Sequence, residues 1–228
     1  MEYTEGMNQM INILYEDNHL LVVEKPINVP IQADDSKDLD FLTMLKDYIK
    51  KRDNKPGNVY LGLVHRLDRP VGGVMVFAKT SKCASRLSEQ VRNRTFKKTY
   101  LAIVEGQIDE SGTFIDKLLK DNKTNMVKVD KSGKEAILDY ELVEYKDSLS
   151  LVRINLKTGR SHQIRVQFSS HGYPLYGDQR YNSNSKVGQQ IALFSNSITF
   201  NHPITKENLT FKLEIPKRIP WNIFKNVK

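Results

Sequence analysis

A succession of short strand-like segments, separated by Gly, Asn, Asp and Ser turns, fills most of the sequence after residue 98. The segments comprise residues 99–106, 112–119, 125–130, 135–145, 148–156, 198–203 and 208–216. Turn residues at such short intervals are typical of strands that follow one another directly in a sheet. We therefore expect antiparallel pairing throughout this part of the chain.

A hairpin and a helix are predicted ahead of this series. Residues 11–17 and 19–26 are strand-like and flank a turn at Asp17-Asn18. The apolar residues of 40–51 recur at a spacing that places them on one face of a helix. The chain is thus predicted to open with β structure that is followed by an amphipathic helix.

Two further helices are predicted. Residues 81–94 are amphipathic, with Ser81 as the predicted N-cap, and Ser161 is predicted to cap a short helix that ends at Gly172. The single cysteine, Cys83, lies in the first of these helices and is expected to be a packing residue. The predicted fold class is α+β, with a mixed, mostly antiparallel central sheet and flanking helices.

An excess of basic residues, 35 Lys and Arg against 27 Asp and Glu, gives the chain a formal charge of +8. Such an excess favours a polyanionic partner, either a nucleic acid or an anionic membrane surface. A single cysteine rules out an internal disulfide, and the first residues do not form a charged-then-apolar leader. We therefore expect a soluble protein of the cytoplasm.

Sequence motifs for a cofactor or a metal are absent. There is no G-x-G-x-x-G or Walker-type loop, and the five histidines have neither zinc-finger nor H-E-x-x-H spacing. The sequence therefore predicts that the protein uses no nucleotide cofactor and no metal.

Three groups of polar residues are candidates for a functional site. Residues 65–68 (HRLD) stand before a glycine pair and the apolar run VMVFA, which predicts a strand buried on both faces. The other two groups are residues 97–100 (KKTY) and 158–165 (TGRSHQIR). Taken singly, each has an ordinary structural explanation, because such residues commonly cap turns, pack in strands or face water.

Taken together, four segments resemble one family. Residues 65–73 (HRLDRPVGG) are similar to the H-R-L-D-x-x-T-S-G signature of the RluA-type pseudouridine synthases, which isomerise uridine in RNA. Residues 25–30 (KPINVP) match the family's K-P-x-G segment, and residues 97–106 match its K-x-Y-x-A-x-V-x-G segment. Residues 158–181 match T-G-R-x-H-Q-I-R through G-D-x-x-Y. The resemblance implies the pseudouridine synthase fold with a central active-site cleft.

The sequence departs from the family pattern at three places. Val71-Gly72-Gly73 stands where Thr-Ser-Gly is usual, and Phe194 stands where a histidine is common. Asn28 replaces the glycine of the first segment, and asparagine still tolerates a positive φ angle. These departures concern substrate positioning more than the chemistry.

The resemblance implies an isomerase with Asp68, Tyr100 and Arg165 as its catalytic residues. Pseudouridine formation breaks the N1–C1′ bond, rotates the uracil, joins C5 to C1′ and removes the C5 proton, with no redox change. Asp68 can add to C1′ or abstract the 2′ proton, and both routes stay open. By resemblance, Arg165 keeps Asp68 ionised, while Tyr100 offers a flat face to the uracil and a phenolic oxygen to the C5 proton.

Substrate-binding roles are also implied by the resemblance. A base inside a helix must be extruded before its sugar bond can react, and Arg66 is expected to fill the vacated stack. An ion pair with Asp68 or a phosphate contact is the alternative role for Arg66. Further substrate-binding residues are expected to be His65, Lys97, Lys98, Arg160, His162, Gln163 and Leu193.

The sequence predicts an RNA partner, either ribosomal RNA or transfer RNA. Arg92, Arg94 and Lys157 flank the candidate segments and are expected to contact the RNA backbone or to form a solvated face. We expect one monomeric catalytic domain over residues 1–228, because the residues before Ile11 are too few for the S4-like domain that the family often carries.

Two other functions stay open on the sequence alone. One is a non-catalytic RNA-binding or chaperone protein on the same scaffold. The other is a hydrolase that cuts the glycosidic bond and releases the base, since carboxylates also catalyse that reaction.

Overall fold

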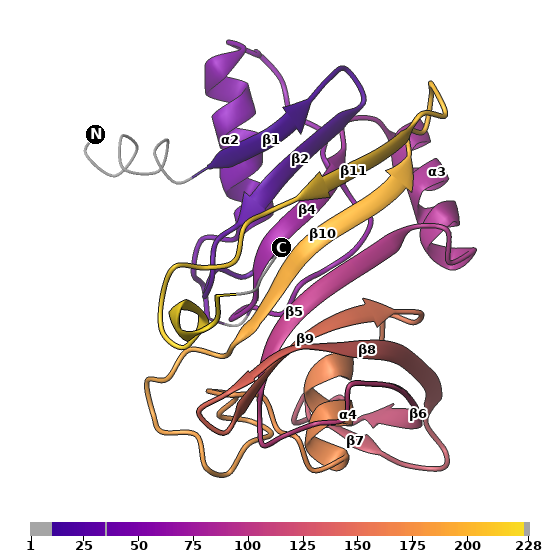
Figure 1. Cartoon of the computed structure of the whole chain (residues 1–228). Helices are drawn as coiled ribbons and strands as arrows, with labels where there is room; N and C mark the ends of the chain where they lie inside the picture. The colour runs from indigo at the N-terminus through magenta and orange to yellow at the C-terminus, as the bar shows by residue number, and fades with distance from the viewer. Residues whose placement is uncertain (1–10, 35, 226–228) are drawn as a thin grey trace. The chain divides into compact units, whose positions relative to one another are not determined.

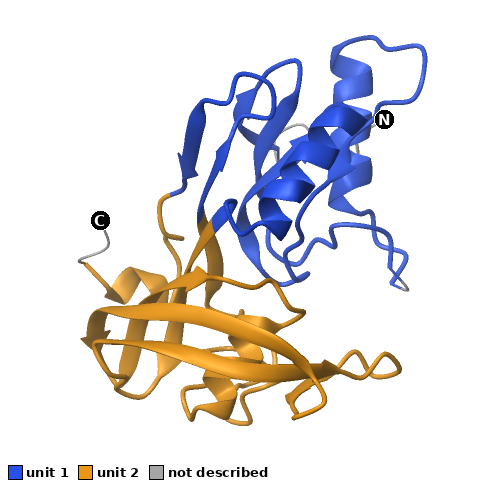
Figure 2. Cartoon of the chain, turned by 90° about the vertical axis from the view of Figure 1, so that its right-hand side faces the viewer, with its two compact units in different colours: residues 1–97, 197–213 blue, residues 98–196, 214–228 orange. Residues whose placement is uncertain are grey.

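The computed structural model describes residues 11–34 and 36–225. The chain divides into two compact units (Figure 2): unit 1 is residues 1–97 and 197–213, and unit 2 is residues 98–196 and 214–228. The prediction of one domain over the whole chain stays a prediction, as does the cleft that the resemblance implies. Each unit is described by itself.

Unit 1 contains an antiparallel sheet and two helices (Figure 1). Its elements are β1 (Asn12–Glu16), β2 (Leu20–Lys25), α2 (Phe41–Arg52), β3 (Gly62–Leu63), β4 (Gly72–Ala78), α3 (Ser81–Arg92), the second part of β10 (Leu193–Asn201) and β11 (Asn208–Lys212). The strand order is β1-β2-β4-β10, while β11 pairs with β10 and β3 pairs with β4. The predicted hairpin is confirmed, because β1 and β2 pair antiparallel around the Asp17-Asn18 turn.

The core of unit 1 is built around β4, in which all seven residues are buried. Val74 and Val76 pack in one apolar cluster with Leu20 and Val22 of the neighbouring β2. Cys83 of α3 is fully buried in the same cluster, in agreement with its predicted packing role. The prediction of a strand buried on both faces is therefore confirmed.

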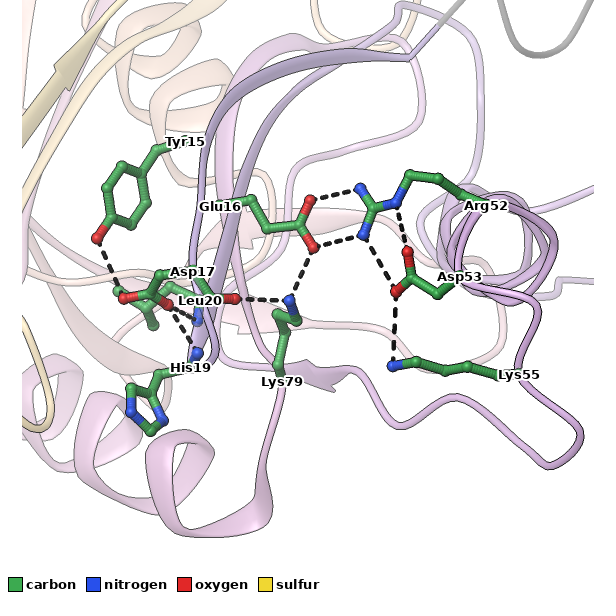
Figure 3. A network of polar contacts seen from close by, with 9 residues as sticks. All are labelled: Tyr15, Glu16, Asp17, His19, Leu20, Arg52, Asp53, Lys55 and Lys79. Carbon is green, nitrogen blue, oxygen red and sulfur yellow. Dashed lines mark hydrogen bonds and ion pairs between the residues drawn. The ribbon is translucent and has the colours of Figure 1, made fainter.

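An ion-pair network fixes the outer part of unit 1 (Figure 3). Arg52, at the end of α2, donates two hydrogen bonds to the Glu16 carboxylate of β1, at 2.6 and 2.9 Å. Lys79 donates to the same carboxylate at 2.7 Å and to the Asp17 carbonyl at 2.6 Å. These cations, Arg52 above all, hold the pKa of Glu16 below its ordinary value. The network joins a helix, a hairpin and the end of β4.

Unit 2 contains a second run of antiparallel strands and one helix. Its elements are β5 (Lys97–Glu105, of which Lys97 belongs to unit 1), β6 (Ser111–Lys120), β7 (Val127–Val129), β8 (Lys134–Lys146), β9 (Leu149–Leu156), α4 (Gln163–Ser170), the first part of β10 and the 3-10 turn η1 (Trp221–Ile223). The strand order is β5-β9-β8-β6-β7. Between β8 and β9, Asp147 and Ser148 both adopt positive φ, which gives a two-residue loop the twist that a hairpin needs.

Helix α4 covers one face of this sheet, as Figure 1 shows beside β6, β7 and β8. Val166 of α4 packs against Leu118, Val127 and Ala136, which come from the three strands. Phe168 of the same helix is fully buried. The α+β fold class is confirmed, and the strand pairs β5–β9, β6–β7, β6–β8 and β8–β9 are all antiparallel.

The predicted N-caps are wrong. Thr80, not Ser81, caps α3 and accepts a hydrogen bond from the Cys83 N–H. The cap position of α4 is His162 rather than Ser161, and His162 adopts φ +51° without a side-chain cap bond. Asp40 caps α2 by accepting from the Thr43 N–H, as its residue type favours. No helix in the described part of the chain is long and apolar enough to cross a membrane.

Candidate active site

Asp68 lies in the segment between β3 and β4 of unit 1 and is half-buried. Its carbonyl accepts a hydrogen bond from the Val71 N–H at 2.9 Å, which closes a tight turn directly after the carboxylate residue. Arg66, two residues earlier, is exposed. The HRLD motif thus presents one accessible cation and one half-buried carboxylate immediately before a fully buried strand.

A buried lysine anchors the turn after Asp68. Lys25, at the end of β2, has only 1% of its surface exposed. Its Nζ donates to the carbonyls of Pro26 at 2.9 Å, Arg69 at 3.0 Å and Val71 at 2.8 Å. Three carbonyls match the three donors of an ammonium group. Because the carbonyls of Arg69 and Val71 belong to the turn that begins at Asp68, Lys25 fixes the backbone that carries the carboxylate.

Burial and a neighbouring negative charge act in opposite directions on the pKa of Lys25. Burial lowers the pKa of Lys25 to about 7, while the negative charge of Asp68 acts in the opposite direction. Asp68 is therefore within electrostatic reach of the buried amine. Lys25 was not predicted as a site residue, although it is the first residue of the matched KPINVP segment.

His65 and Arg69 hold the Asp68 segment on its two sides. The His65 ring is buried, its Nε2 accepts the Val76 N–H at 3.2 Å, and it lies 5.4 Å from the Phe96 ring. Arg69 donates to Ser36 Oγ at 2.9 Å and pairs with the Asp38 carboxylate. These contacts are structural, and the substrate-binding role of His65 stays a prediction.

The second candidate segment lies on β5 of unit 2. Tyr100 is buried and faces Ile154 of β9 in the strand register. Lys98 is half-buried, and burial lowers the pKa of its amine. A side chain at Gly159 would begin only 3.0 Å from Lys98 Nζ, so glycine there lets the amine approach the T-G-R segment. Lys97 is exposed.

Gln163 organises the third candidate segment. Its Oε1 accepts hydrogen bonds from Thr158 Oγ1 at 2.8 Å and from the Arg160 N–H at 3.0 Å. Its Nε2 donates to the Ile137 carbonyl at 3.1 Å and to Gln167 Oε1 at 3.0 Å. Gln163 is buried, so the structure assigns its amide to folding the loop that presents Arg160. Its substrate-binding role stays a prediction.

A buried ion pair orients Arg165. Its Nε donates to Asp178 Oδ2 at 2.8 Å and its Nη2 to Asp178 Oδ1 at 2.7 Å, a bidentate arrangement. The guanidinium also lies over the Tyr181 ring, with 5.2 Å from Cζ to the ring centroid. Asp178 and Tyr181 were not predicted as site residues, although both belong to the matched G-D-x-x-Y motif.

Tyr181 links Arg165 to His162. Its hydroxyl accepts the Val127 N–H at 3.0 Å and lies 2.7 Å from His162 Nδ1. Because a hydroxyl that accepts one bond can donate another, Tyr181 can donate to Nδ1, which places the hydrogen of a neutral His162 ring on Nε2. The structure thus brings His162, Arg165 and Tyr181 together at the start of α4.

The departures from the family pattern have clear local consequences. Asn28 adopts φ +62°, which confirms that asparagine takes over the left-handed position of the missing glycine. Phe194 is buried and its ring lies 6.3 Å from that of Trp221. Leu193, the neighbouring predicted substrate contact, is buried as well. Among the described residues, no group of His, Cys, Asp and Glu is arranged to hold a metal ion.

The chain belongs to the RNA pseudouridylate synthase family, whose model matches residues 19–170. It is 34% identical over 210 residues to an RNA pseudouridine synthase of Bacillus subtilis, YhcT, covering 90% of this chain and 69% of that protein. It is 35% identical to the ribosomal large subunit pseudouridine synthase C of Buchnera aphidicola, covering 86% of this chain and 64% of that protein. These relatives confirm the resemblance to the RluA-type enzymes.

Solved structures confirm the fold. Human RNA pseudouridylate synthase domain containing 4 aligns with a TM-score of 0.77 at 21% identity, covering 95% of this chain and 92% of that one. Human RNA pseudouridylate synthase domain containing 1 aligns with a TM-score of 0.74 at 23% identity, over 90% and 84% of the two chains. The chain therefore has the pseudouridine synthase fold.

Proposed function

We propose that this chain is an RNA pseudouridine synthase, an isomerase with Asp68 as its catalytic carboxylate. One observation carries the proposal. The carboxylate that the family signature supplies stands on a turn that Lys25 anchors through the carbonyls of Arg69 and Val71. A buried amine used in this way makes the position of Asp68 reproducible, which a reacting group requires.

The proposed reaction begins with extrusion of the target uridine. Unstacking costs a few kcal/mol, and the exposed guanidinium of Arg66 is planar and can occupy the vacated stack. Asp68 then adds to C1′ or removes the 2′ proton, and the N1–C1′ bond breaks. After the uracil rotates, C5 bonds to C1′, the C5 proton leaves to a base and N1 takes up a proton. Atoms and charge balance without an oxidant or a cofactor.

Tyr100 and Arg165 are proposed to serve the same reaction from unit 2. Tyr100 offers an aromatic face for the base and an oxygen for the C5 proton. Arg165 is proposed to orient the Asp68 carboxylate through its positive charge. The bidentate hold of Asp178 on Arg165 supports this role, because it leaves the guanidinium one orientation. The remaining predicted contacts, including Arg160, His162, Lys97 and Lys98, are proposed to bind the flanking nucleotides.

Ribosomal RNA is the first substrate to test, because a relative is named for the ribosomal large subunit. Transfer RNA is the second. We further propose that the protein acts in the cytoplasm as a monomer and without a cofactor.

Nucleoside analysis of RNA incubated with the purified protein tests the function. We expect pseudouridine at a defined position and no free base. Release of free uracil would identify a hydrolase instead. RNA that is bound but chemically unchanged would identify a non-catalytic RNA-binding protein.

A further inference from the structure

The end of β6, the strand β7 and the start of β8 form a lysine-rich hairpin, residues 117–134. Its six lysines, all exposed, are Lys117, Lys120, Lys123, Lys128, Lys131 and Lys134. Against them stand two aspartates, so the net charge is +4, half of the formal +8 of the whole chain. The roles proposed for Asp68, Tyr100 and Arg165 make no use of this concentration of charge.

The two aspartates of the lysine hairpin shape its turns. Asp121 Oδ1 accepts the Lys123 N–H at 2.8 Å, and Asp130 Oδ1 accepts the Ser132 N–H at 3.0 Å. Lys128 pairs with Asp130 at 3.1 Å. None of the other five lysines forms an ion pair within residues 11–34 and 36–225. Most of the positive charge is thus directed to solvent.

The lysine hairpin is fixed to the rest of unit 2. Val127 is buried against α4, and its N–H donates to the Tyr181 hydroxyl at 3.0 Å. Asp116, next to the hairpin on β6, accepts a hydrogen bond from Gln167 of α4 at 2.8 Å. The lysines therefore stand on a scaffold with a defined position relative to α4.

A basic surface continues from the lysine hairpin to the T-G-R segment. Arg160 donates through Nε to the Glu135 carbonyl at 2.9 Å. Glu135 of β8 faces Lys117 of β6 in the strand register. Arg160 and Lys117 therefore both lie beside the same residue of β8. Ile115, two residues before Lys117 on the same face of β6, is 67% exposed.

We propose that the lysine hairpin binds the phosphate backbone of the RNA on unit 2, beside the T-G-R segment; that this RNA is a substrate rests on the proposed function. RNA carries a negative charge at every nucleotide, which complements a surface on which five of the six lysines form no ion pair within the described residues. The exposed apolar side chain of Ile115 on the same face suits the sugar surface of such a ligand. Backbone contacts supply affinity without sequence information, so the hairpin affects binding and leaves the chemical step unchanged.

The test compares two triple variants that remove the same charge. One carries Lys117→Ala, Lys120→Ala and Lys123→Ala in the lysine hairpin. The control carries Lys50→Ala, Lys51→Ala and Lys82→Ala, which are exposed residues of α2 and of α3 in unit 1. For each, the RNA dissociation constant is measured on a single-stranded substrate over a range of salt concentrations, and the turnover rate at saturating RNA.

Each lost contact to a single-stranded phosphate lowers the slope of log affinity against log salt by about 0.7, so three contacts lower it by about 2. We expect that change in the hairpin variant, with an unchanged turnover rate, and a change of less than about 0.7 in the control. Equal slopes for the hairpin variant and the wild type would overturn the inference. An equal decrease of the slope in the hairpin variant and in the control variant would overturn it as well. If the wild type bound RNA without forming pseudouridine while the hairpin variant still lost slope, the proposed function would fail and this inference would stand.

Discussion

Arg165 and Asp178 form a bidentate ion pair in which both side chains are buried, with 7% and 0% of their surface exposed. Asp178 Oδ1 also accepts the Arg180 N–H at 3.0 Å. The carboxylate therefore joins an arginine of α4 to the loop that follows the helix. Such a pair has one favourable geometry, which fixes the guanidinium plane.

Asp178→Asn should destabilise the protein and slow turnover. The NH2 group of the asparagine would face an N–H of Arg165 where a carboxylate oxygen accepted a hydrogen bond. Breaking a buried ion pair commonly costs about 3–5 kcal/mol. We expect a free energy of unfolding lower by that order, and a turnover rate that falls more than RNA affinity does. Urea unfolding and single-turnover kinetics on the same preparation measure both.

Asp139→Asn is the matched control for that variant. Asp139 pairs with Lys157 at 2.8 Å, but both side chains are well exposed, so the change should cost less than about 1 kcal/mol. Similar losses in the two variants would show that the Arg165–Asp178 pair has no special role in orienting the arginine.

Tyr181→Phe should separate the ring contact of that tyrosine from its two hydroxyl hydrogen bonds. The phenylalanine ring can still lie under Arg165, while the bonds to His162 Nδ1 and to the Val127 N–H are lost. We expect a loss of about 1–3 kcal/mol in stability, since a buried donor is left without its acceptor. RNA affinity should weaken more than turnover slows, because His162 is proposed to bind substrate. A slower turnover with unchanged affinity would contradict this division.

Lys25→Met should change the pH dependence of stability. The folded-state pKa of Lys25 is about 7, below the ordinary 10.5, so between these values the unfolded state holds more protons and stability rises with pH. Below pH 7 the amine is charged in both states and this dependence disappears. Asp68, which raises the pKa of Lys25, and Arg69, which lowers it, are the charges that act on the amine.

The wild type should therefore gain stability relative to Lys25→Met from pH 7 to pH 9, by up to about 1.4 kcal/mol per pH unit. Urea unfolding of both proteins at several pH values measures the difference, in which the other titrating groups cancel. Parallel pH profiles would show that the amine is not held at a lowered pKa.

Arg66→Lys should slow the reaction on a duplex-embedded uridine while changing overall RNA affinity little. Lysine keeps the charge that contacts phosphate but lacks the plane that stacks, and stacking of this kind is worth about 1–3 kcal/mol. A drop in rate of about 5-fold to 150-fold on the duplex is expected from that energy, with a smaller drop on single-stranded RNA. Equal rates for both proteins on the duplex would remove the stacking role.

Most elements of this fold could be predicted from sequence because they have a local signal, whereas β3, η1 and the first part of β10 were not predicted. The buried strand β4 follows from its unbroken apolar run, and the hairpin β1–β2 from the turn at Asp17-Asn18. The caps of α3 and α4 could not be predicted as reliably. At the start of α4, the cap residue His162 contacts the hydroxyl of Tyr181, nineteen positions away in the chain.

Sequence motifs indicated individual residues of the candidate site but not the contacts that hold them. Asp68, Tyr100 and Arg165 stand in recognisable motifs, but motif letters do not say which groups hold them. The anchor of the Asp68 turn is Lys25, whose partners Arg69 and Val71 are more than forty residues away. The expected role of Arg165 toward Asp68 stays a prediction, and the structure pairs Arg165 with the Asp178 carboxylate, a partner that the sequence alone did not indicate.

The central claim is that Asp68 performs chemistry on uridine rather than capping a turn. Asp68→Asn keeps nearly the same size, but the amide is a far weaker nucleophile and base. The turn itself depends on the Asp68 carbonyl and on Lys25, which the variant retains, so folding and RNA affinity should persist. Melting temperature and RNA affinity are controls on the same preparation.

The most direct measurement is tritium release from RNA labelled at uracil C5, since that proton leaves when the base is rejoined through carbon. The wild type should release tritium in proportion to the pseudouridine formed, and folded, RNA-binding Asp68→Asn should release none above background. Release at a rate near that of the wild type from the variant would contradict the assignment of Asp68 as the catalytic carboxylate.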